Sequence, residues 1–265
     1  MANPPLTIPF DPNSSTLPSR KNLPKVSGAP DGAAWVWGPA DNLGRLNLLT
    51  PTRIASAAKL ITTGLVVPLN LPLTVPAVPA FGRQPFKHTI KALTPGLSYD
   101  DLYELNTQSG SQWDGFRHCA HFSSGKFYNG ITAGEIVGPE ANSRIGMGCW
   151  AERGIVGRGV LLDYWGFVHG TEKEYDPFEW HAISWEELRK CGESQGVDIR
   201  PVSEGGDIHV GDLLFLRSGW CAAYEGKSGE ERERAALRVH VLGPEDKQRC
   251  KLFDGIRAWV RALLT

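Results

Sequence analysis

The apolar residues of this chain occur in short runs that glycine and proline separate, and this pattern limits the fold more than any other feature. The 265 residues include 30 glycines and 19 prolines. Residues 160–162 and 213–216 are short apolar runs next to glycine turns, and each predicts a buried strand. Ser184 and Glu187 form a capping box that predicts a helix ending near Gly196. Together these patterns predict an α/β or α+β fold in one domain.

The segment that begins at residue 50 predicts a helix followed by an edge strand. Thr50 is a suitable N-cap, Pro51 fits the first helical position and Gly64 ends the helix. Residues 65–73 form a branched apolar run that two prolines interrupt. Because proline cannot donate a ladder hydrogen bond, this run predicts a strand at the edge of a sheet.

The two ends of the chain differ in pattern from its middle. Residues 1–30 combine many prolines with Asn, Ser and Gly and show no periodicity. They predict an extended arm that lies on the domain or on a partner. Residues 252–263 repeat apolar side chains at helical spacing and predict a packed helix.

Composition and charge exclude several classes of function. The formal charge of −1 gives no electrostatic reason to expect a nucleic acid or an anionic membrane as a partner. No apolar run approaches the roughly 18 residues of a membrane span, and the first residues lack the pattern of a secretory signal. Five scattered cysteines without a CxxC pair predict buried thiols in a reducing compartment, and therefore a cytoplasmic protein. A small molecule is the expected partner.

Residues 108–118, with the sequence QSGSQWDGFRH, hold the strongest chemical signal. Alternation along a strand would place four of them on one face: Gln108, Gly110, Gln112 and Asp114. His118 follows after Gly115, where the chain can turn. A carboxylate and an imidazole so placed can serve as a metal ligand and a general acid/base. The spacing alone favours the alternative of a solvated edge strand with an ordinary histidine.

The same stretch resembles the motif H-x-G-T-H-x-D-x-P-x-H of the cyclase and kynurenine-formamidase-like superfamily. In an ungapped alignment Gln108 and Gln112 stand at the two outer histidine positions. Asp114 stands at the aspartate and His118 at the final histidine. Four other segments resemble the subfamily common in fungi and some bacteria: residues 37–51, 127–130, 154–163 and 211–220. The similarity covers roughly residues 30 to 222 in order, which is specific for the family and much less so for the reaction.

This resemblance implies a swivelling β/β/α fold, with a mixed sheet flanked by helices, at residues 31–222. Residues 1–30 are then an arm, and residues 223–265 a divergent C-terminal tail. The implied activity is that of a metal-dependent hydrolase or cyclase acting on a small amide, lactam or N-formyl compound, as arylformamidases of tryptophan catabolism do. The resemblance also implies a homo-oligomer, since the family often forms dimers or tetramers.

The site residues follow from the same resemblance. Asp114, Gln108 and Gln112 would hold a divalent metal, Mn or Zn, and His118 would shuttle protons as the catalytic residue. We expect three aromatic residues to bind the substrate: Trp37, Trp113 and Tyr128. The alternative for such aromatic residues is that they fill the core.

Two departures from the family pattern support a second hypothesis. The amide oxygens of Gln108 and Gln112 are poor ligands for Zn²⁺, although harder Mn²⁺ or Mg²⁺ tolerates them. The family's downstream histidine and glutamate have no match in residues 223–265. The second hypothesis is therefore that the chain is a metal-free binding protein or a metal-independent ring-forming enzyme.

Overall fold

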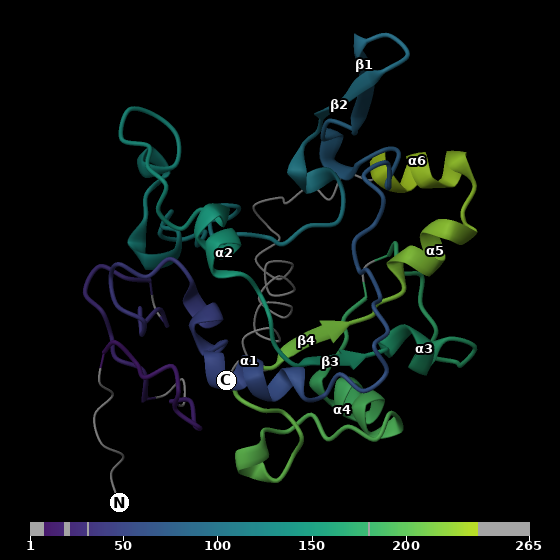
Figure 1. Ribbon diagram of the computed structural model, residues 1–265. Coiled ribbons are helices and arrows are strands. Elements are labelled where there is room, and N and C mark those ends of the chain that lie inside the picture. The colour runs from purple at the N-terminus through teal and green to yellow at the C-terminus, as the bar shows by residue number, and fades with distance from the viewer. Residues whose placement is uncertain (1–7, 19–21, 31, 180, 238–265) are drawn as a thin grey trace, which may run out of the picture.

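The computed structural model describes residues 8–18, 22–30, 32–179 and 181–237 (Figure 1). The helix predicted at residues 252–263 lies outside these ranges. The described residues form two separate two-stranded sheets and six α-helices. The strands are β1 (Lys87–Thr94), β2 (Ser98–Glu104), β3 (Gly159–Leu162) and β4 (Leu213–Leu216). The helices are α1 (Pro51–Ala58), α2 (Met147–Arg153), α3 (Tyr164–Val168), α4 (Trp185–Ser194), α5 (Trp220–Gly226) and α6 (Gly229–Leu237).

The parallel pair β3–β4 forms the centre of the largest core. Gly159 pairs with Leu213 and Leu162 pairs with Leu216, so both predicted strands are confirmed. Parallel strands require a crossover connection, and here α3 and α4 lie between the two strands in sequence. Six side chains that are at most 1% exposed form the core beside this sheet: Leu162, Tyr164, Val168, Leu188, Cys191 and Ile199.

Helix α4 forms where its capping box predicts it. The Ser184 hydroxyl accepts a hydrogen bond from the Glu187 backbone N–H, and the Glu187 carboxylate accepts one from the Ser184 N–H at 2.8 Å. Gly192 faces the core, where a Cβ atom would lie 2.7 Å from the Val197 carbonyl oxygen. Glycine at this position therefore allows the helix to pack closely on the chain that follows it.

The segment after Thr50 departs from its prediction. Helix α1 begins at Pro51 as expected, but it ends at Ala58, and the Thr50 side chain makes no capping hydrogen bond. Residues 65–73 are not a strand, so the predicted edge strand is wrong. The physical reason is that Pro68 and Pro72 remove two donors from the segment. The Leu71 N–H bonds instead to the Ser111 hydroxyl.

Strands β1 and β2 form an antiparallel hairpin. The sequence patterns did not predict it. Lys87 pairs with Glu104 at its base, and Thr94 pairs with Ser98 next to the turn. Figure 1 shows the hairpin projecting away from the β3–β4 sheet. Helix α6 contacts the short 3-10 helix η3 (Ala80–Gly82), which precedes the hairpin.

The described part of the N-terminal arm packs on its own chain. The Phe10 N–H donates to the Val36 carbonyl at 2.7 Å, and the Phe10 ring meets Trp37 edge-on at 5.6 Å. The Arg53 guanidinium donates to the carbonyls of Pro12 and Ser14. Described residues 10–14 therefore contact residues 36–53, and the arm expected at residues 1–30 stays a prediction.

Of the four cysteines in the described ranges, three are not fully buried, which differs from the prediction of buried thiols, and Cys250 lies outside those ranges. Cys191 is buried, Cys221 is exposed, and Cys119 and Cys149 are half-buried. Burial raises the pKa of the Cys191 thiol to about 11, because an apolar environment disfavours the thiolate.

Within the described ranges, no helix has the length and apolar character needed to cross a membrane.

Two adjacent leucines of β3 test the position of the core. Leu162 is fully buried, whereas Leu161 is 52% exposed. We expect Leu162→Ala to lower the free energy of unfolding by about 2–5 kcal/mol, because it leaves a cavity, and Leu161→Ala to lower it by less than about 1 kcal/mol. Urea denaturation measures both, and equal losses would contradict this placement of the core.

Candidate functional site

The motif at residues 108–118 does not form the predicted strand. Gln108 lies in the 3-10 helix η4 (Thr107–Ser109), where the Asn106 side chain accepts a hydrogen bond from the Gln108 N–H. Two further hydrogen bonds hold this short helix in place. The Gln108 carbonyl accepts from Arg83, and the Ser109 hydroxyl donates to the Gln84 carbonyl. The segment therefore folds as a loop beside the base of the hairpin.

The predicted site side chains meet in spite of this difference. The Gln108 side-chain amide donates to the Asp114 carboxylate at 3.2 Å, and the Gln112 amide donates to the Gln108 amide oxygen. The His118 Nδ1 atom lies 3.8 Å from the Asp114 Oδ1 atom. This is an ion-pair distance rather than a hydrogen bond. The side chains of Asp114 and His118 are 56% and 37% exposed, so solvent reaches both.

Phe116 anchors this loop between Asp114 and His118. Its ring stacks on Tyr128 with centroids 4.2 Å apart, and it meets Trp150 edge-on at 5.2 Å. On another side it abuts Gly44, where a Cβ atom would lie 2.5 Å from the ring. Gly44 also has a φ of +57°, a conformation that glycine adopts at little cost. This contact joins the segment of residues 37–51 to the site loop.

The Asp41 carboxylate organises that segment. It accepts hydrogen bonds from the Leu43 and Gly44 N–H groups, from the Asn47 amide and, at 2.6 Å, from the Tyr128 hydroxyl. Burial and the neighbouring Asp41 charge both raise the pKa of Tyr128 above its ordinary value. Tyr128 therefore stays a neutral donor, and its contacts hold the scaffold together. The substrate-binding role expected of it stays a prediction.

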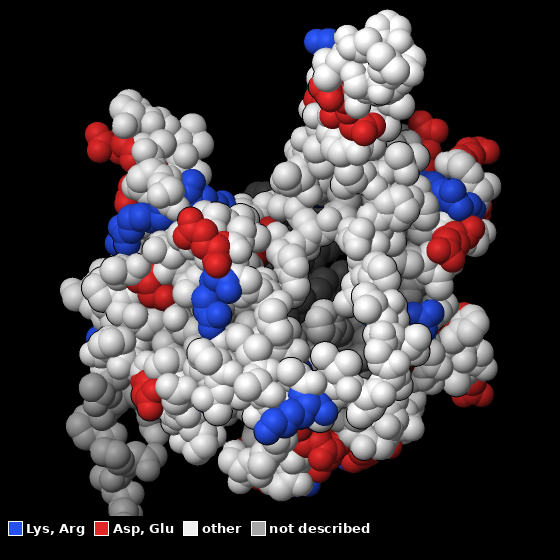
Figure 2. Space-filling view, in the orientation of Figure 1, with Lys and Arg blue, Asp and Glu red and all other residues white. Residues whose placement is uncertain are grey.

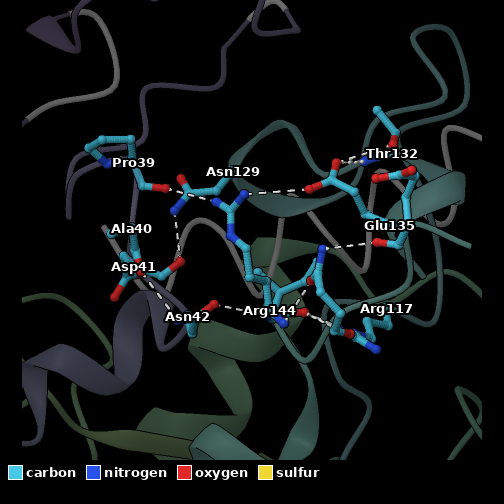
Figure 3. Close-up of polar contacts among 12 residues, drawn as sticks. Pro39, Ala40, Asp41, Asn42, Arg117, Asn129, Thr132, Glu135 and Arg144 are labelled. Carbon is cyan, nitrogen blue, oxygen red and sulfur yellow. Dashed lines mark hydrogen bonds and ion pairs between the residues drawn. The ribbon is translucent and has the colours of Figure 1, made fainter.

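A second polar network supports the loop on its other side (Figure 3). The Arg117 side chain donates to the Arg144 carbonyl at 2.8 Å, and the Arg144 side chain donates to the Pro39 carbonyl at 3.0 Å and pairs with Glu135. The Asn129 amide donates to the Gly38 and Asp41 carbonyls. The sequence patterns did not indicate four residues that support the site loop: Asp41, Arg117, Asn129 and Arg144. Asp41 and Asn129 lie in segments of the family resemblance, which was the available signal.

Within the part of the chain that the structure describes, no ring contact joins Trp37 or Trp113 to Tyr128. Trp37 packs against the arm, and Trp113 is 55% exposed. A shallow open hollow does exist elsewhere, lined by residues that include Trp165, His169 and Tyr175, but it contains none of the motif residues. The substrate-binding roles of Trp37 and Trp113 stay predictions.

The donor chemistry of the motif fits a zinc centre poorly. It offers one carboxylate, one imidazole and two neutral amides, and the amides already bond to each other and to Asp114. Among the residues that the structure describes, no three or more His, Cys, Asp and Glu side chains gather where they could hold a metal ion. Catalytic zinc sites use three stronger protein ligands. We therefore assign no step of a reaction to a metal.

Comparison with known proteins supports the fold. No family model matches the chain, and no curated protein matches it. One matching solved structure, described as the crystal structure of a novel cyclase, has a TM-score of 0.62 and 24% sequence identity. The match covers 75% of this chain and 65% of the cyclase chain. The likeness shows a cyclase-like α/β fold, and it confirms the predicted fold class.

Two glycines with positive φ test the contact that positions the site loop. Gly44→Ala and Gly64→Ala both place a side chain in the left-handed region, at a cost of about 1–2 kcal/mol. Only Gly44→Ala also collides with Phe116, whereas Gly64 has nothing within 4 Å of a new Cβ atom. We expect a clearly larger loss of unfolding free energy for Gly44→Ala in thermal or urea denaturation. Equal losses would show that Phe116 moves aside freely.

Proposed function

We propose that this chain is a hydrolase or cyclase that acts on a small amide, lactam or N-formyl compound. The observation that carries the proposal is the approach of His118 to Asp114 on a solvent-accessible loop held from two sides. The fold shared with a cyclase structure and the motif resemblance support the same class. Arylformamidase-type substrates, which are N-formyl aromatic amines, are the first compounds to test.

Hydrolysis of such a compound requires one side chain that accepts a proton and later donates it. The His118 imidazole takes a proton from water while the water oxygen attacks the carbonyl carbon. The carbon–nitrogen bond then breaks as the imidazolium returns this proton to the leaving nitrogen. The Asp114 carboxylate stabilises the imidazolium that forms between the two transfers. In the reverse direction the same transfers close a ring.

The binding-protein hypothesis has one observation in its favour. The amides of Gln108 and Gln112 stand where the family has histidines, and they form a hydrogen-bonded chain that ends on Asp114. Such a chain can recognise the carbonyl and N–H groups of a ligand without any reaction. This hypothesis predicts binding of the same compounds with no turnover.

Replacement of His118 tests the proposed acid/base. We expect His118→Ala to reduce turnover of an amide or lactam by about 10²- to 10⁴-fold, with an unchanged circular dichroism spectrum because His118 lies outside the core. The matched control is His209→Ala, at another exposed histidine, which should keep full activity. Full turnover by His118→Ala would exclude His118 as the acid/base, and an inactive wild type that binds these compounds would favour the binding protein.

A metal assay tests the conclusion from the donor set. We expect the purified chain to carry less than one equivalent of zinc by plasma mass spectrometry, because neutral amides stand in place of the imidazole ligands that zinc prefers. Stoichiometric metal that Asp114→Asn removes, together with activity that a chelator abolishes, would instead show a metal-dependent hydrolase.

A further inference from the structure

The side-chain amides of Gln108 and Gln112 form a chain of hydrogen bonds that has one direction. A carboxylate only accepts hydrogen bonds, so the Asp114 carboxylate receives an N–H from the Gln108 amide at 3.2 Å. The oxygen of the Gln108 amide accepts an N–H from Gln112 in turn. Asp114 therefore sets the orientation of both amides.

Gln112, at the outer end of this chain, keeps a hydrogen-bond donor for a further partner. A primary amide has two N–H donors and one oxygen acceptor. Among the residues that the structure describes, the Gln112 side chain uses one N–H, toward Gln108, and its oxygen accepts no hydrogen bond. The side chain is exposed. A molecule that enters from solvent can therefore reach the second N–H.

The amide chain and the proposed proton carrier meet at one oxygen atom. The Gln108 amide nitrogen lies 3.2 Å from the Asp114 Oδ1 atom, and the His118 Nδ1 atom lies 3.8 Å from the same oxygen. Because Nδ1 is on the side of Asp114, the His118 Nε2 atom is the ring nitrogen that can exchange a proton with a substrate. One carboxylate thus holds a neutral donor chain and an imidazole next to each other.

The backbone that carries the amide chain is fixed before any substrate binds. The Gln108 N–H donates to the Asn106 side chain at 2.8 Å, and the Gln108 carbonyl accepts from Arg83 at 3.2 Å. A Cβ atom at Gly110 would lie 3.3 Å from the Val75 carbonyl oxygen, so the chain passes close to its neighbour there. Donors held in place in this way stabilise a developing negative charge without reorganising during the reaction.

The surface charges suit an uncharged substrate. Among the described residues on the face that Figure 2 shows, Lys and Arg side chains lie interspersed with Asp and Glu. The formal charge of the chain is −1, so neither sign dominates. A neutral N–H group can bind the oxygen of an uncharged carbonyl compound, and this recognition needs no charged field.

We propose that the second N–H of Gln112 donates to the carbonyl oxygen of the substrate, which makes Gln112 a further catalytic residue and Gln108 the residue that positions it. This inference rests on the hydrolase or cyclase function proposed above. As the water oxygen bonds to the carbonyl carbon, the π electron pair moves onto the carbonyl oxygen, and the Gln112 N–H stabilises this negative charge. The pair returns when the carbon–nitrogen bond breaks, and the leaving nitrogen takes from His118 the proton that the water gave up.

An apolar substitution of nearly the same shape tests this role. We expect Gln112→Leu to lower kcat for an N-formyl aromatic amine by about 10²- to 10³-fold. KM should change by only a few-fold, because the negative charge forms in the transition state. The matched control is Gln84→Leu, which also removes an amide that donates to a carboxylate, that of Glu104, and should keep full activity. Circular dichroism should show both variants folded, since neither side chain lies in the core.

A substrate with sulfur in place of the carbonyl oxygen gives a measurement that a merely structural role would not move. Sulfur is the weaker hydrogen-bond acceptor, so the wild type should prefer the oxygen compound, and Gln112→Leu should lose roughly tenfold or more of that preference. Gln84→Leu should show the ratio of the wild type.

The outcomes separate this inference from the function on which it rests. A wild type that turns over none of these compounds would overturn both. An active wild type overturns the inference alone if Gln112→Leu keeps its kcat, if only its KM rises, or if its oxygen preference is unchanged. Equal losses in Gln112→Leu and Gln84→Leu would likewise exclude a specific role for Gln112.

Discussion

The hydrogen bonds of the Asp41 carboxylate are the interaction on which the candidate site depends. A half-buried carboxylate is costly unless donors surround it, and here two backbone N–H groups, an amide and a phenol do so. The phenol belongs to Tyr128, and the Tyr128 ring supports Phe116. One charge therefore fixes the turn at Gly44 and the ring on which the site loop rests. The motif near residue 41 and the motif near residue 116 act as one structural unit.

The site loop combines a rigid support with exposed chemical groups. Phe116 and Arg117 tie its centre to the scaffold, while Asp114 and His118 on either side remain open to solvent. Binding and catalytic residues of proteins often lie on loops that a rigid scaffold positions. The hydrogen bonds that run from Gln112 through Gln108 to Asp114 restrict the position of the carboxylate.

Sequence patterns predicted the elements whose signals are local. The capping box at Ser184 and the glycine-bounded runs of β3 and β4 appear in the structure because local preference and tertiary packing agree there. The strand predicted at residues 65–73 was wrong, because an apolar composition does not show whether a neighbouring strand exists for it to pair with. The hairpin was missed although Pro95–Gly96 is a turn signal. The sequence predicted that Gln108, Gln112 and Asp114 lie together, but it did so from the geometry of a strand that does not form. The role of Asp41 depends on a partner 87 residues away in sequence, which no local pattern reveals.

The parallel pairing of β3 with β4 has a consequence for the order in which the chain folds during synthesis. Residues 159–162 leave the ribosome long before residues 213–216, so β3 must wait for its partner while its apolar side chains are exposed. Helix α4 has its own capping box and can form in this interval, because helices need only local contacts. By packing on β3 it covers part of the strand early. Early formation of α4 would thus leave less of the apolar surface of β3 exposed while β4 is still to be made.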